Sequence, residues 1–265
     1  SFRSWGSLRL LTFLSPLPSF FFLCFGDHRD LHSCTPSFPS RRSSDLPTSY
    51  LQHCLYRGVD GVLVACIDFN DPQVQELAQS RLPLVTIDYA FDNRVAVVSD
   101  NVSGLEELVR YVYQKGHRKI AYLHGEPSVV TRSRLTGFRK ACEELELEIP
   151  ENYVRECVYH DPDRCGRETR ELLALPDRPT CIIFPDDYSY IGGLNAITEA
   201  GLRVPEDISA VGYDGIHLAR ILKLTTYRQN TQDLGRIAAE RLIQLIEHPK
   251  TAQPTRILVP GGLLE

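Results

Sequence analysis

The stretch Gly61-Val-Leu-Val-Ala-Cys-Ile67 decides the fold class of this 265-residue chain. A continuous apolar run of this kind, bounded by Asp60 and Asp68, is typical of a β-strand that is covered on both faces. Asp71-Pro72 follows closely and predicts the start of a helix, because Asp is a preferred N-cap and Pro suits the first helical position. A buried strand that leads into a helix indicates an α/β protein.

The same strand-and-helix unit recurs along the chain. Further strands are expected at 84–87, 119–123, 154–159, 181–184, 208–211 and 256–259, and helices at 50–57, 72–82, 102–116, 135–145, 166–175, 190–200 and 234–246. Strands separated by helical crossovers imply parallel sheets with helices on both faces. We therefore expect an α/β fold of two doubly wound lobes.

Composition excludes several classes of function. The net charge of −5 argues against binding of a nucleic-acid phosphate backbone by this chain itself, because such binding needs clustered Lys and Arg. The 8 cysteines lack metal-site spacing and disulfide-scaffold density, which favours buried free thiols in a reducing cytoplasm. No segment reaches the roughly 20 apolar residues of a membrane span. Neither a metal nor a cofactor is expected.

Residues 1–46 do not match the rest of the sequence. They are rich in Ser, Phe, Leu, Pro and Arg, and Pro16 and Pro18 interrupt the apolar runs. We interpret 1–46 as a non-native or disordered segment, resembling translated non-coding DNA. A signal peptide is the alternative, because Arg3 and Arg9 precede apolar residues.

Polar side chains follow several predicted strands, where parallel sheets bind their ligands. The principal candidates are Asp88, Arg134, Asp186, Asp214 and Gln229, and the secondary candidates are Tyr89, Phe91, Asp161, Asp187, Tyr188 and Tyr213. One strand-end Asp is more often a helix cap than a ligand, but the set together indicates a binding site. Carboxylates accept from hydroxyls and a guanidinium donates to neighbouring oxygens, so the site suits a polyol. The aromatic residues either cover a sugar face or pack in the core.

No catalytic constellation accompanies these residues. Asp186 and Asp187 are adjacent and point in different directions, and no positioned His or nucleophile motif lies with them. His117 follows a helix-ending Gly, where a packing role is expected. Gly192-Gly193 lies inside a helical pattern and is therefore no phosphate loop. We predict that the chain is not an enzyme.

Five motifs in register identify a family resemblance. They are Gly116-His-Arg-Lys-Ile-Ala-Tyr-Leu123, Arg134-Leu-Thr-Gly-Phe138, Pro179-Thr-Cys-Ile-Ile-Phe184 with Asp186-Asp187, Val204-Pro-Glu-Asp-Ile-Ser-Ala-Val-Gly-Tyr-Asp214, and Leu224-Thr-Thr-Tyr-Arg-Gln229. The chain from about Tyr50 to Glu265 resembles transcription regulators of the LacI/GalR type. The resemblance implies a type I periplasmic-binding-protein-like core whose two lobes hold a sugar-like effector in a cleft.

The resemblance also implies domains and partners. The lobes are expected at 47–98 with 229–250 and at 99–228 with 251–265, the first lobe being incomplete and the helix-turn-helix head being absent. The parent protein is expected to be a cytoplasmic homodimer that binds operator DNA through that head. An exported sugar-binding protein of a transporter, which shares this fold, is the alternative.

Residue matching places Asp88, Arg134, Asp186, Asp214 and Gln229 at effector contacts. Asp186 departs from the Asn that is more usual there, which replaces a mixed donor and acceptor with an acceptor. Near Asp161, where some relatives stack an aromatic residue on the ligand, this chain has His160-Asp-Pro-Asp163.

Overall fold

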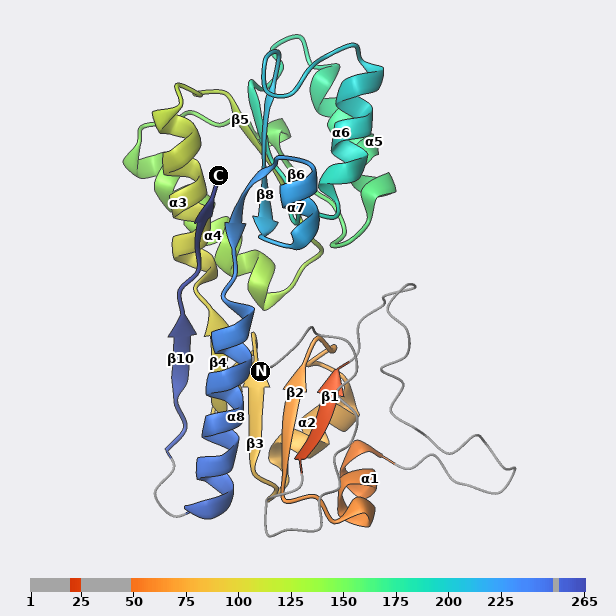
Figure 1. Cartoon of the computed structure of the whole chain (residues 1–265), viewed down its shortest axis with the longest axis vertical. Coiled ribbons are helices and arrows are strands. Elements are labelled where there is room, and N and C mark those ends of the chain that lie inside the picture. The colour runs from red at the N-terminus through yellow and green to blue at the C-terminus, as the bar shows by residue number, and fades with distance from the viewer. Residues whose placement is uncertain (1–19, 25–48, 250–252) are drawn as a thin grey trace, which may run out of the picture. The chain divides into compact units, whose positions relative to one another are not determined.

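A computed structural model describes residues 20–24, 49–249 and 253–265. Its described residues divide into two compact units, one comprising those up to Val98 together with Gln232–Leu258, the other Ser99–Thr231 with Val259–Glu265 (Figure 1). Each unit contains a mostly parallel sheet with helices on both faces. The predicted α/β class is confirmed.

The sheet of the first unit has the strand order β1-β2-β3-β4-β10. These strands are β1 (Phe20–Cys24), β2 (Gly61–Ala65), β3 (Leu84–Ile87), β4 (Val95–Ser99) and β10 (Arg256–Val259). The pairs β1–β2, β2–β3 and β3–β4 are parallel. Its helices are α1 (Tyr50–Arg57), α2 (Pro72–Gln79) and α8 (Thr231–Glu247).

Both faces of β2 are covered, as its apolar sequence predicts. Val62 and Val64 belong to a core cluster with Cys54 of α1 and Leu77 of α2. A Cβ atom at Gly61 would lie 2.9 Å from Leu242 and Ile246 of α8. The strand therefore lies between α1 and α2 on one face and α8 on the other.

The second unit has a six-stranded sheet in the order β11-β9-β8-β7-β5-β6. Its strands are β5 (Ile120–His124), β6 (Val154–Glu156), β7 (Cys181–Ile183), β8 (Ser209–Asp214), β9 (Thr225–Arg228) and the antiparallel edge strand β11 (Gly262–Leu264). Its helices are α3 (Asn101–Gln114), α4 (Val129–Glu144), α5 (Pro162–Leu173), α6 (Tyr190–Glu199) and the short α7 (His217–Ile221), with the 3-10 turn η1 (Glu151–Tyr153).

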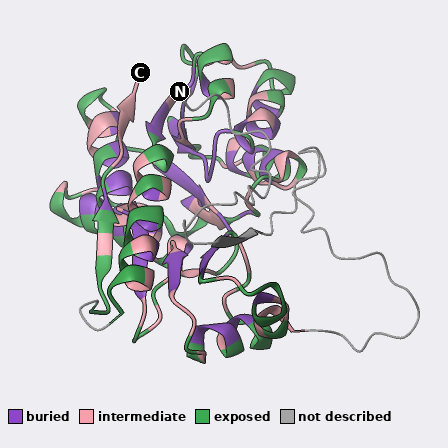
Figure 2. Ribbon diagram, turned by 60° about the horizontal axis from the view of Figure 1, so that its bottom comes forward, coloured by how far each residue is buried: buried purple, intermediate pink, exposed green. Residues whose placement is uncertain are grey.

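Alternate residues of β5 face two separate cores. Ile120 and Tyr122 pack with α3 and α4 on one face, whereas Ala121 and Leu123 pack with α5 and α6 on the other. Figure 2 shows the consequence, since the central strands are buried while the helices present exposed outer surfaces. This sandwich fixes the ends of the strands, from which the candidate site is built.

Several elements differ from the prediction. The strand expected at 154–159 ends at Glu156, and the expected elements did not include β1, β4, β11 or α7. The missed β4 carries the buried sequence Val-Ala-Val-Val-Ser, a second apolar run that follows the Leu84–Ile87 strand within a few residues. The apolar character of β4 is evident in the sequence. The repeating pattern, however, places a helix between successive strands, and no helix separates β4 from β3.

One predicted domain boundary differs from the division into compact units. We assigned 251–265 wholly to the second lobe, but Arg256–Val259 forms β10 beside β4, where the amide of Ala96 donates to the carbonyl of Thr255 at 2.9 Å. The strand pattern alone did not reveal which sheet it joins. Of the segment 1–46, Phe20–Cys24 pairs with β2, and the remainder lies outside the described residues.

The cysteines for which the structure describes the side chain are all free thiols. Cys54, Cys142, Cys157, Cys165 and Cys181 are buried, as predicted, whereas Cys66 is exposed. Burial raises the pKa of the Cys54 thiol to about 11 and that of Cys142 to about 12. These thiols remain protonated near neutral pH and act as small apolar groups.

Candidate functional site

Polar side chains gather at the carboxyl edge of the sheet in the second unit. Asp214 is the last residue of β8, Asp186 follows β7 and Gln229 follows β9. Arg134 lies in α4, which follows β5. An ion pair and a hydrogen bond join Arg134, Asp214 and Gln229 directly. The chain thus brings together three of the five principal candidates.

The guanidinium of Arg134 is held on every nitrogen. Nε donates to Oδ1 of Asn101 and Nη1 donates to the carbonyl of Pro185, both at 2.9 Å. Nη2 lies 3.6 Å from Oδ1 of Asp214, and the guanidinium carbon lies 3.6 Å from the centre of the Tyr213 ring. Only 4% of Arg134 is exposed. A buried charge needs such partners, and they fix its position.

Asp214 and Gln229 continue this network. Oδ1 of Asp214 accepts from Nε2 of Gln229 at 2.6 Å, and Oε1 of Gln229 accepts from the Ser99 hydroxyl at 2.6 Å. Oδ2 of Asp214 accepts no hydrogen bond from any residue that the structure describes. Burial raises the pKa of the Asp214 carboxyl, and the charge of Arg134 opposes that rise. The backbone of Asp214 is left-handed, with φ of 102°.

Asp186 has both carboxylate oxygens occupied by the protein. Oδ1 accepts from the amide of Ser189 at 2.7 Å, while Oδ2 accepts from the Ser189 hydroxyl at 2.8 Å and the amide of His160 at 3.0 Å. The His160 ring nitrogen Nδ1 lies 3.6 Å from Oδ1. Asp186 therefore connects the loop before α5 with the turn that begins α6.

Asp187 points to a different set of partners, as its adjacency to Asp186 predicted. Its Oδ1 accepts from the Thr226 hydroxyl at 2.6 Å and its Oδ2 accepts from the amide of Ile216 at 2.9 Å. Burial raises the pKa of Asp187 to about 7, and the hydrogen bonds from Thr226 and Ile216 oppose that rise. The side chain holds the segment after Asp214 against β9.

The remaining candidates of the second unit differ in exposure. Tyr213 is buried and its hydroxyl donates to Oδ1 of Asn101 at 3.3 Å. Asp161 caps α5 by accepting from the amide of Arg164 at 2.8 Å. Tyr188 is 43% exposed, and its ring centre lies 6.5 Å from that of His160. Of the three, Tyr188 presents the largest free surface.

Three candidates lie in the first unit. Asp88 follows β3 with a left-handed φ of 61°, and its amide donates to the carbonyl of Val97 at 3.0 Å. Tyr89 stacks on Phe69 with ring centres 4.5 Å apart, and Phe91 packs against Tyr89 at 4.8 Å. These residues form an aromatic group at the carboxyl edge of the first sheet.

Sequence reasoning missed several residues in or beside the network in the second unit. Ser99 is the last residue of β4 and Asn101 is the first of α3, and because β4 was not predicted, their place at a sheet edge was not recognised. The Tyr159 ring lies 5.4 Å from the Arg134 guanidinium, and its hydroxyl lies 3.0 Å from that of Thr131. Tyr122 is buried, and its hydroxyl has no partner among the described residues.

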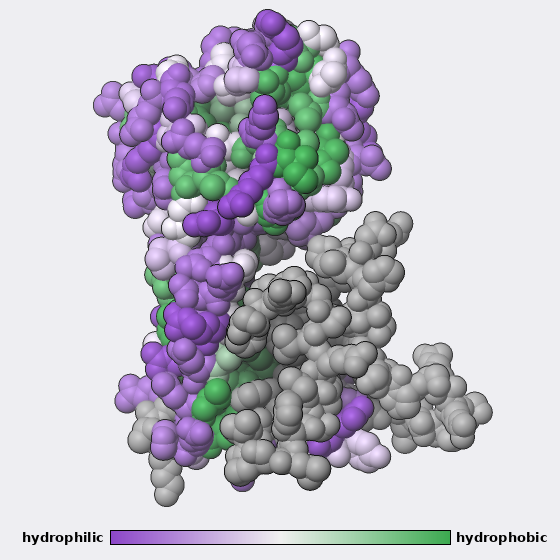
Figure 3. All heavy atoms as spheres, in the orientation of Figure 1, coloured by the Kyte–Doolittle hydropathy of each residue, from purple (hydrophilic) through white to green (hydrophobic). Residues whose placement is uncertain are grey.

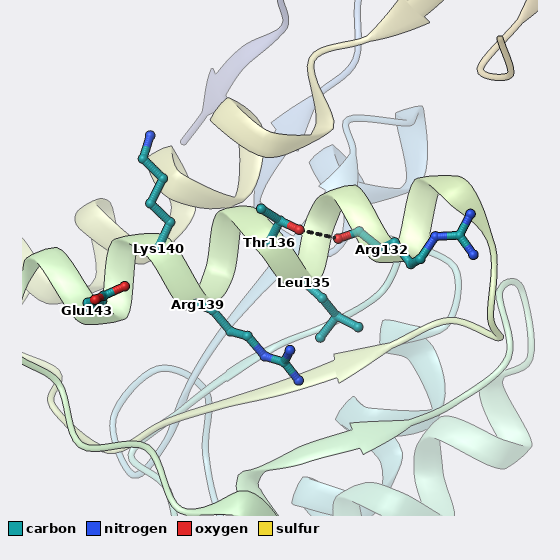
Figure 4. Close-up of a pocket in the computed structure, with 6 residues that line it drawn as sticks. All are labelled: Arg132, Leu135, Thr136, Arg139, Lys140 and Glu143. Carbon is teal, nitrogen blue, oxygen red and sulfur yellow. Dashed lines mark hydrogen bonds between the residues drawn. The ribbon is translucent and has the colours of Figure 1, made fainter. Parts of the chain in front are cut away.

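A surface hollow occurs elsewhere, on the outer side of α4 (Figure 4). Its lining residues are Arg132, Leu135, Thr136, Arg139, Lys140 and Glu143. The Thr136 hydroxyl donates to the carbonyl of Arg132 at 2.8 Å, an ordinary helical contact. The lining contains none of the predicted site residues, so we place no binding site there.

Neither a metal site nor a membrane-spanning helix occurs among the residues that the structure describes. Within 20–24, 49–249 and 253–265, no group of His, Cys, Asp and Glu side chains is arranged to hold a metal ion. Among the helices of the same residues, none has the length and apolar character needed to cross a bilayer.

Figure 3 shows an exposed apolar area on the face of the second unit that carries α7, where Ile216 and Ile221 are exposed.

Comparisons with known proteins agree with this architecture. Residues 109–265 match the family described as "Periplasmic binding protein-like domain". The HTH-type transcriptional repressor PurR of Escherichia coli is 34% identical over 224 residues, which cover 82% of this chain and 65% of the repressor. The chain thus spans less than two thirds of the length of this curated relative.

Solved structures give the same result. A regulatory protein of the LacI family from Chloroflexus aggregans is 30% identical, with a TM-score of 0.73 over 81% of this chain and 79% of that one. The transcriptional regulator CelR in complex with cellobiose is 28% identical, with a TM-score of 0.71 over 82% and 70% of the two chains. The chain therefore belongs to the periplasmic binding protein-like domain family, as an effector-binding core of the LacI type.

Proposed function

We propose that this effector-binding core senses a small, hydroxyl-rich molecule, with a sugar as the expected class. The observation that carries the proposal is the network of Arg134, Asp214 and Gln229 at the carboxyl edge of the second sheet. Parallel α/β sheets bind ligands at this edge. The network joins a fixed cation to a carboxylate by an ion pair, and that carboxylate to an amide by a hydrogen bond.

The chemistry of the free atoms supports a polyol. Oδ2 of Asp214 is an open acceptor for a hydroxyl, and the amide of Gln229 has a second proton beyond the one given to Asp214. The Ser99 hydroxyl fixes the orientation of that amide. Neighbouring hydroxyls of a sugar can donate to the carboxylate and accept from the amide at the same time.

The relatives support a regulatory role for the intact protein. PurR is a transcriptional repressor of the HTH type, and CelR was solved with cellobiose. We propose accordingly that the parent protein is a cytoplasmic homodimer in which the effector changes operator binding. An exported sugar-binding protein is the second candidate, but the relatives named above are regulators.

The effector assignments of single residues are proposals as well. Asp214, Gln229 and Arg134 form the proposed contact group, and Tyr188 is proposed as an aromatic surface at its rim. Asp88, Tyr89 and Phe91 are proposed on the strength of residue matching and strand-end position. The contacts of Asp186, Asp161 and Asp187 favour a positioning role, because their oxygens serve the protein backbone and hydroxyls.

A ligand-induced shift in melting temperature tests the proposal. A panel of neutral mono- and disaccharides, including D-ribose, D-glucose and cellobiose, is added to the chain, and at least one member is expected to raise the melting temperature. Arg134→Ala should abolish that rise, because it removes the cation that orients Asp214. Stabilisation is expected since a ligand that binds only the folded state raises its stability.

Arg139→Ala serves as the matched control. Arg139 lies on the exposed side of the same helix and lines the surface hollow instead. It should keep the full stabilisation. Because Arg134 is buried, Gln229→Ala provides a second variant that leaves the buried charge pair in place. Undiminished stabilisation in both Arg134→Ala and Gln229→Ala would show that the network does not bind the effector.

A further inference from the structure

We infer that the site selects an uncharged effector and discriminates against the phosphorylated or carboxylated form of the same molecule. The inference rests on the proposed function and specifies the chemical class of the ligand. It follows from three properties of the second unit: the balance of charge around Arg134, the occupation of its helix N-termini, and the composition of its carboxyl-edge loops.

Carboxylates outnumber cations around the proposed contact group. Arg134 provides one fixed positive charge, and its nitrogens are engaged by Asn101, Pro185 and Asp214. Asp214 and Asp186 both lie at this edge, and the charge of Asp186 adds to the effect of burial in raising the pKa of the Asp214 carboxyl. An incoming anion would have to displace a partner of Arg134 and would then face at least one of these carboxylates. Both steps are unfavourable in a desolvated site.

Helix N-termini are the other common anion sites of this fold, because their free amides and dipole attract phosphate. Here protein groups already engage amides at these helix ends. Asp161 accepts from the amide of Arg164 in α5, the hydroxyl of Ser128 accepts from the amide of Thr131 in α4, and the amide of Tyr190 in α6 donates to the carbonyl of Asp186. The carboxylates of Asp161 and Asp186 lie at the starts of α5 and α6, so a phosphate would meet negative charge there.

The loops at this edge contain more carboxylates than basic side chains. Residues 124–128, 157–161, 184–189, 215–216 and 229–230 contain neither Lys nor Arg, and their basic residues are His124 and His160, whereas they include Glu126, Asp161, Asp186 and Asp187. The nearest exposed arginines along the chain, Arg132, Arg220 and Arg228, lie in the first turn of α4, in α7 and at the end of β9. These loops therefore provide no Lys or Arg to neutralise a phosphate, and Nδ1 of His160 lies 3.6 Å from Oδ1 of Asp186.

The carboxyl-edge loops of the first unit have the same composition. Residues 66–71 and 88–93 contain Asp68, Asp71, Asp88 and Asp92 and no Lys or Arg. The guanidinium of Arg94 is engaged with backbone carbonyls, including that of Ala78 at 2.7 Å and that of Leu82 at 3.0 Å. Each unit by itself thus has carboxylates and neither Lys nor Arg in the stated loops at this edge.

Paired titrations test the inference. The neutral sugar that gives the largest thermal shift is compared with its phosphate ester by isothermal titration calorimetry, for example D-ribose with D-ribose 5-phosphate or D-glucose with D-glucose 6-phosphate. The phosphate is expected to bind at least about tenfold more weakly, because juxtaposed like charges are costly. The ratio of the two dissociation constants should shrink as salt is raised.

The outcomes separate the two proposals. A phosphate ester that binds as tightly as the neutral sugar, or more tightly, overturns the charge inference and leaves sugar sensing intact. If no member of the panel binds in either form, the proposed function itself is wrong and the inference falls with it.

A matched pair of variants tests whether Asp214 is responsible for the discrimination between the neutral sugar and its phosphate ester. Asp214→Asn removes one negative charge from the network and should reduce the ratio of dissociation constants several-fold. Asp207→Asn removes the same charge at the opposite edge, where Asp207 pairs with Arg203 before β8, and should leave the ratio unchanged. An equal effect of both variants, or an unchanged ratio in a folded Asp214→Asn, would contradict the inference. The comparison on the unmodified chain holds if Asp214→Asn fails to fold.

Discussion

At the scale of single residues, sequence reasoning placed several polar side chains at one sheet edge but did not reveal the partners of each. Asp186 was expected to contact the effector, and its departure from Asn was expected to alter ligand choice. The structure gives a different reason for the carboxylate, because both oxygens accept hydrogen bonds, from Ser189 and from the amide of His160. An Asn side chain has one oxygen and could accept only part of this set. Strand-end position predicts proximity, whereas partners depend on loop geometry.

Asp187 is expected to make the stability of the chain pH-dependent. Its pKa is about 7 in the folded chain and about 3.9 in an unfolded one. The folded state therefore holds a proton that the unfolded state has lost, so stability falls as pH rises between these values. Relative to Asp187→Asn, the unmodified chain should lose roughly 2–3 kcal/mol of unfolding free energy between pH 5 and pH 8.

Denaturant unfolding at several pH values measures this difference. Asp163→Asn, at an exposed position in the first turn of α5, provides a control in which the difference should stay nearly constant. A difference between Asp187→Asn and the unmodified chain that does not change with pH would mean that Asp187 is ionised throughout this range.

At the scale of elements, the glycines of α5 and α6 explain how these helices pack on one face of the second sheet. A Cβ atom at Gly192 would lie 1.7 Å from the carbonyl oxygen of Pro162, and one at Gly166 would lie 3.1 Å from that of Gly192. The helical interpretation of Gly192-Gly193 is confirmed, and the pair serves close helix contact. His117 is likewise a packing residue, with its ring nitrogens 2.9 Å from Oγ1 of Thr180 and Oγ of Ser209.

Gly192→Ala is expected to destabilise the chain strongly. The added methyl group would overlap a backbone carbonyl, which cannot move as a flexible side chain could, so a loss of about 2–3 kcal/mol in unfolding free energy is expected. Gly262→Ala is the control, because a Cβ atom there meets nothing within 4 Å. Equal melting temperatures for the two variants would refute this account of the α5–α6 contact.

At the scale of the whole molecule, the alternation of strands and helices predicted the fold class and most elements. Two kinds of information were absent from the pattern. The periodicity of Arg256–Val259 did not say which sheet it joins, and β4 was hidden because no helix separates it from β3. Missing β4 also concealed Ser99 and Asn101, so one local omission removed two members of the network.

The chain by itself is expected not to bind DNA specifically. Its net charge is −5, whereas binding of a phosphate backbone needs clustered Lys and Arg. An electrophoretic mobility assay at near-physiological salt should show no retarded complex with duplexes from the regulator's own promoter region. Retention of such a duplex by this chain would contradict this expectation.

The left-handed backbone at the strand ends would constrain how such a core evolves. Cys66, Asp88, His160 and Asp214 all have positive φ, and each lies at or soon after the end of a parallel strand. A non-glycine residue in this region costs roughly 1–2 kcal/mol. Selection for thermal stability alone would therefore favour Gly or Asn at these positions and would erode the site. A more stable variant of this core, obtained without selection for binding, is expected to be a poorer sensor.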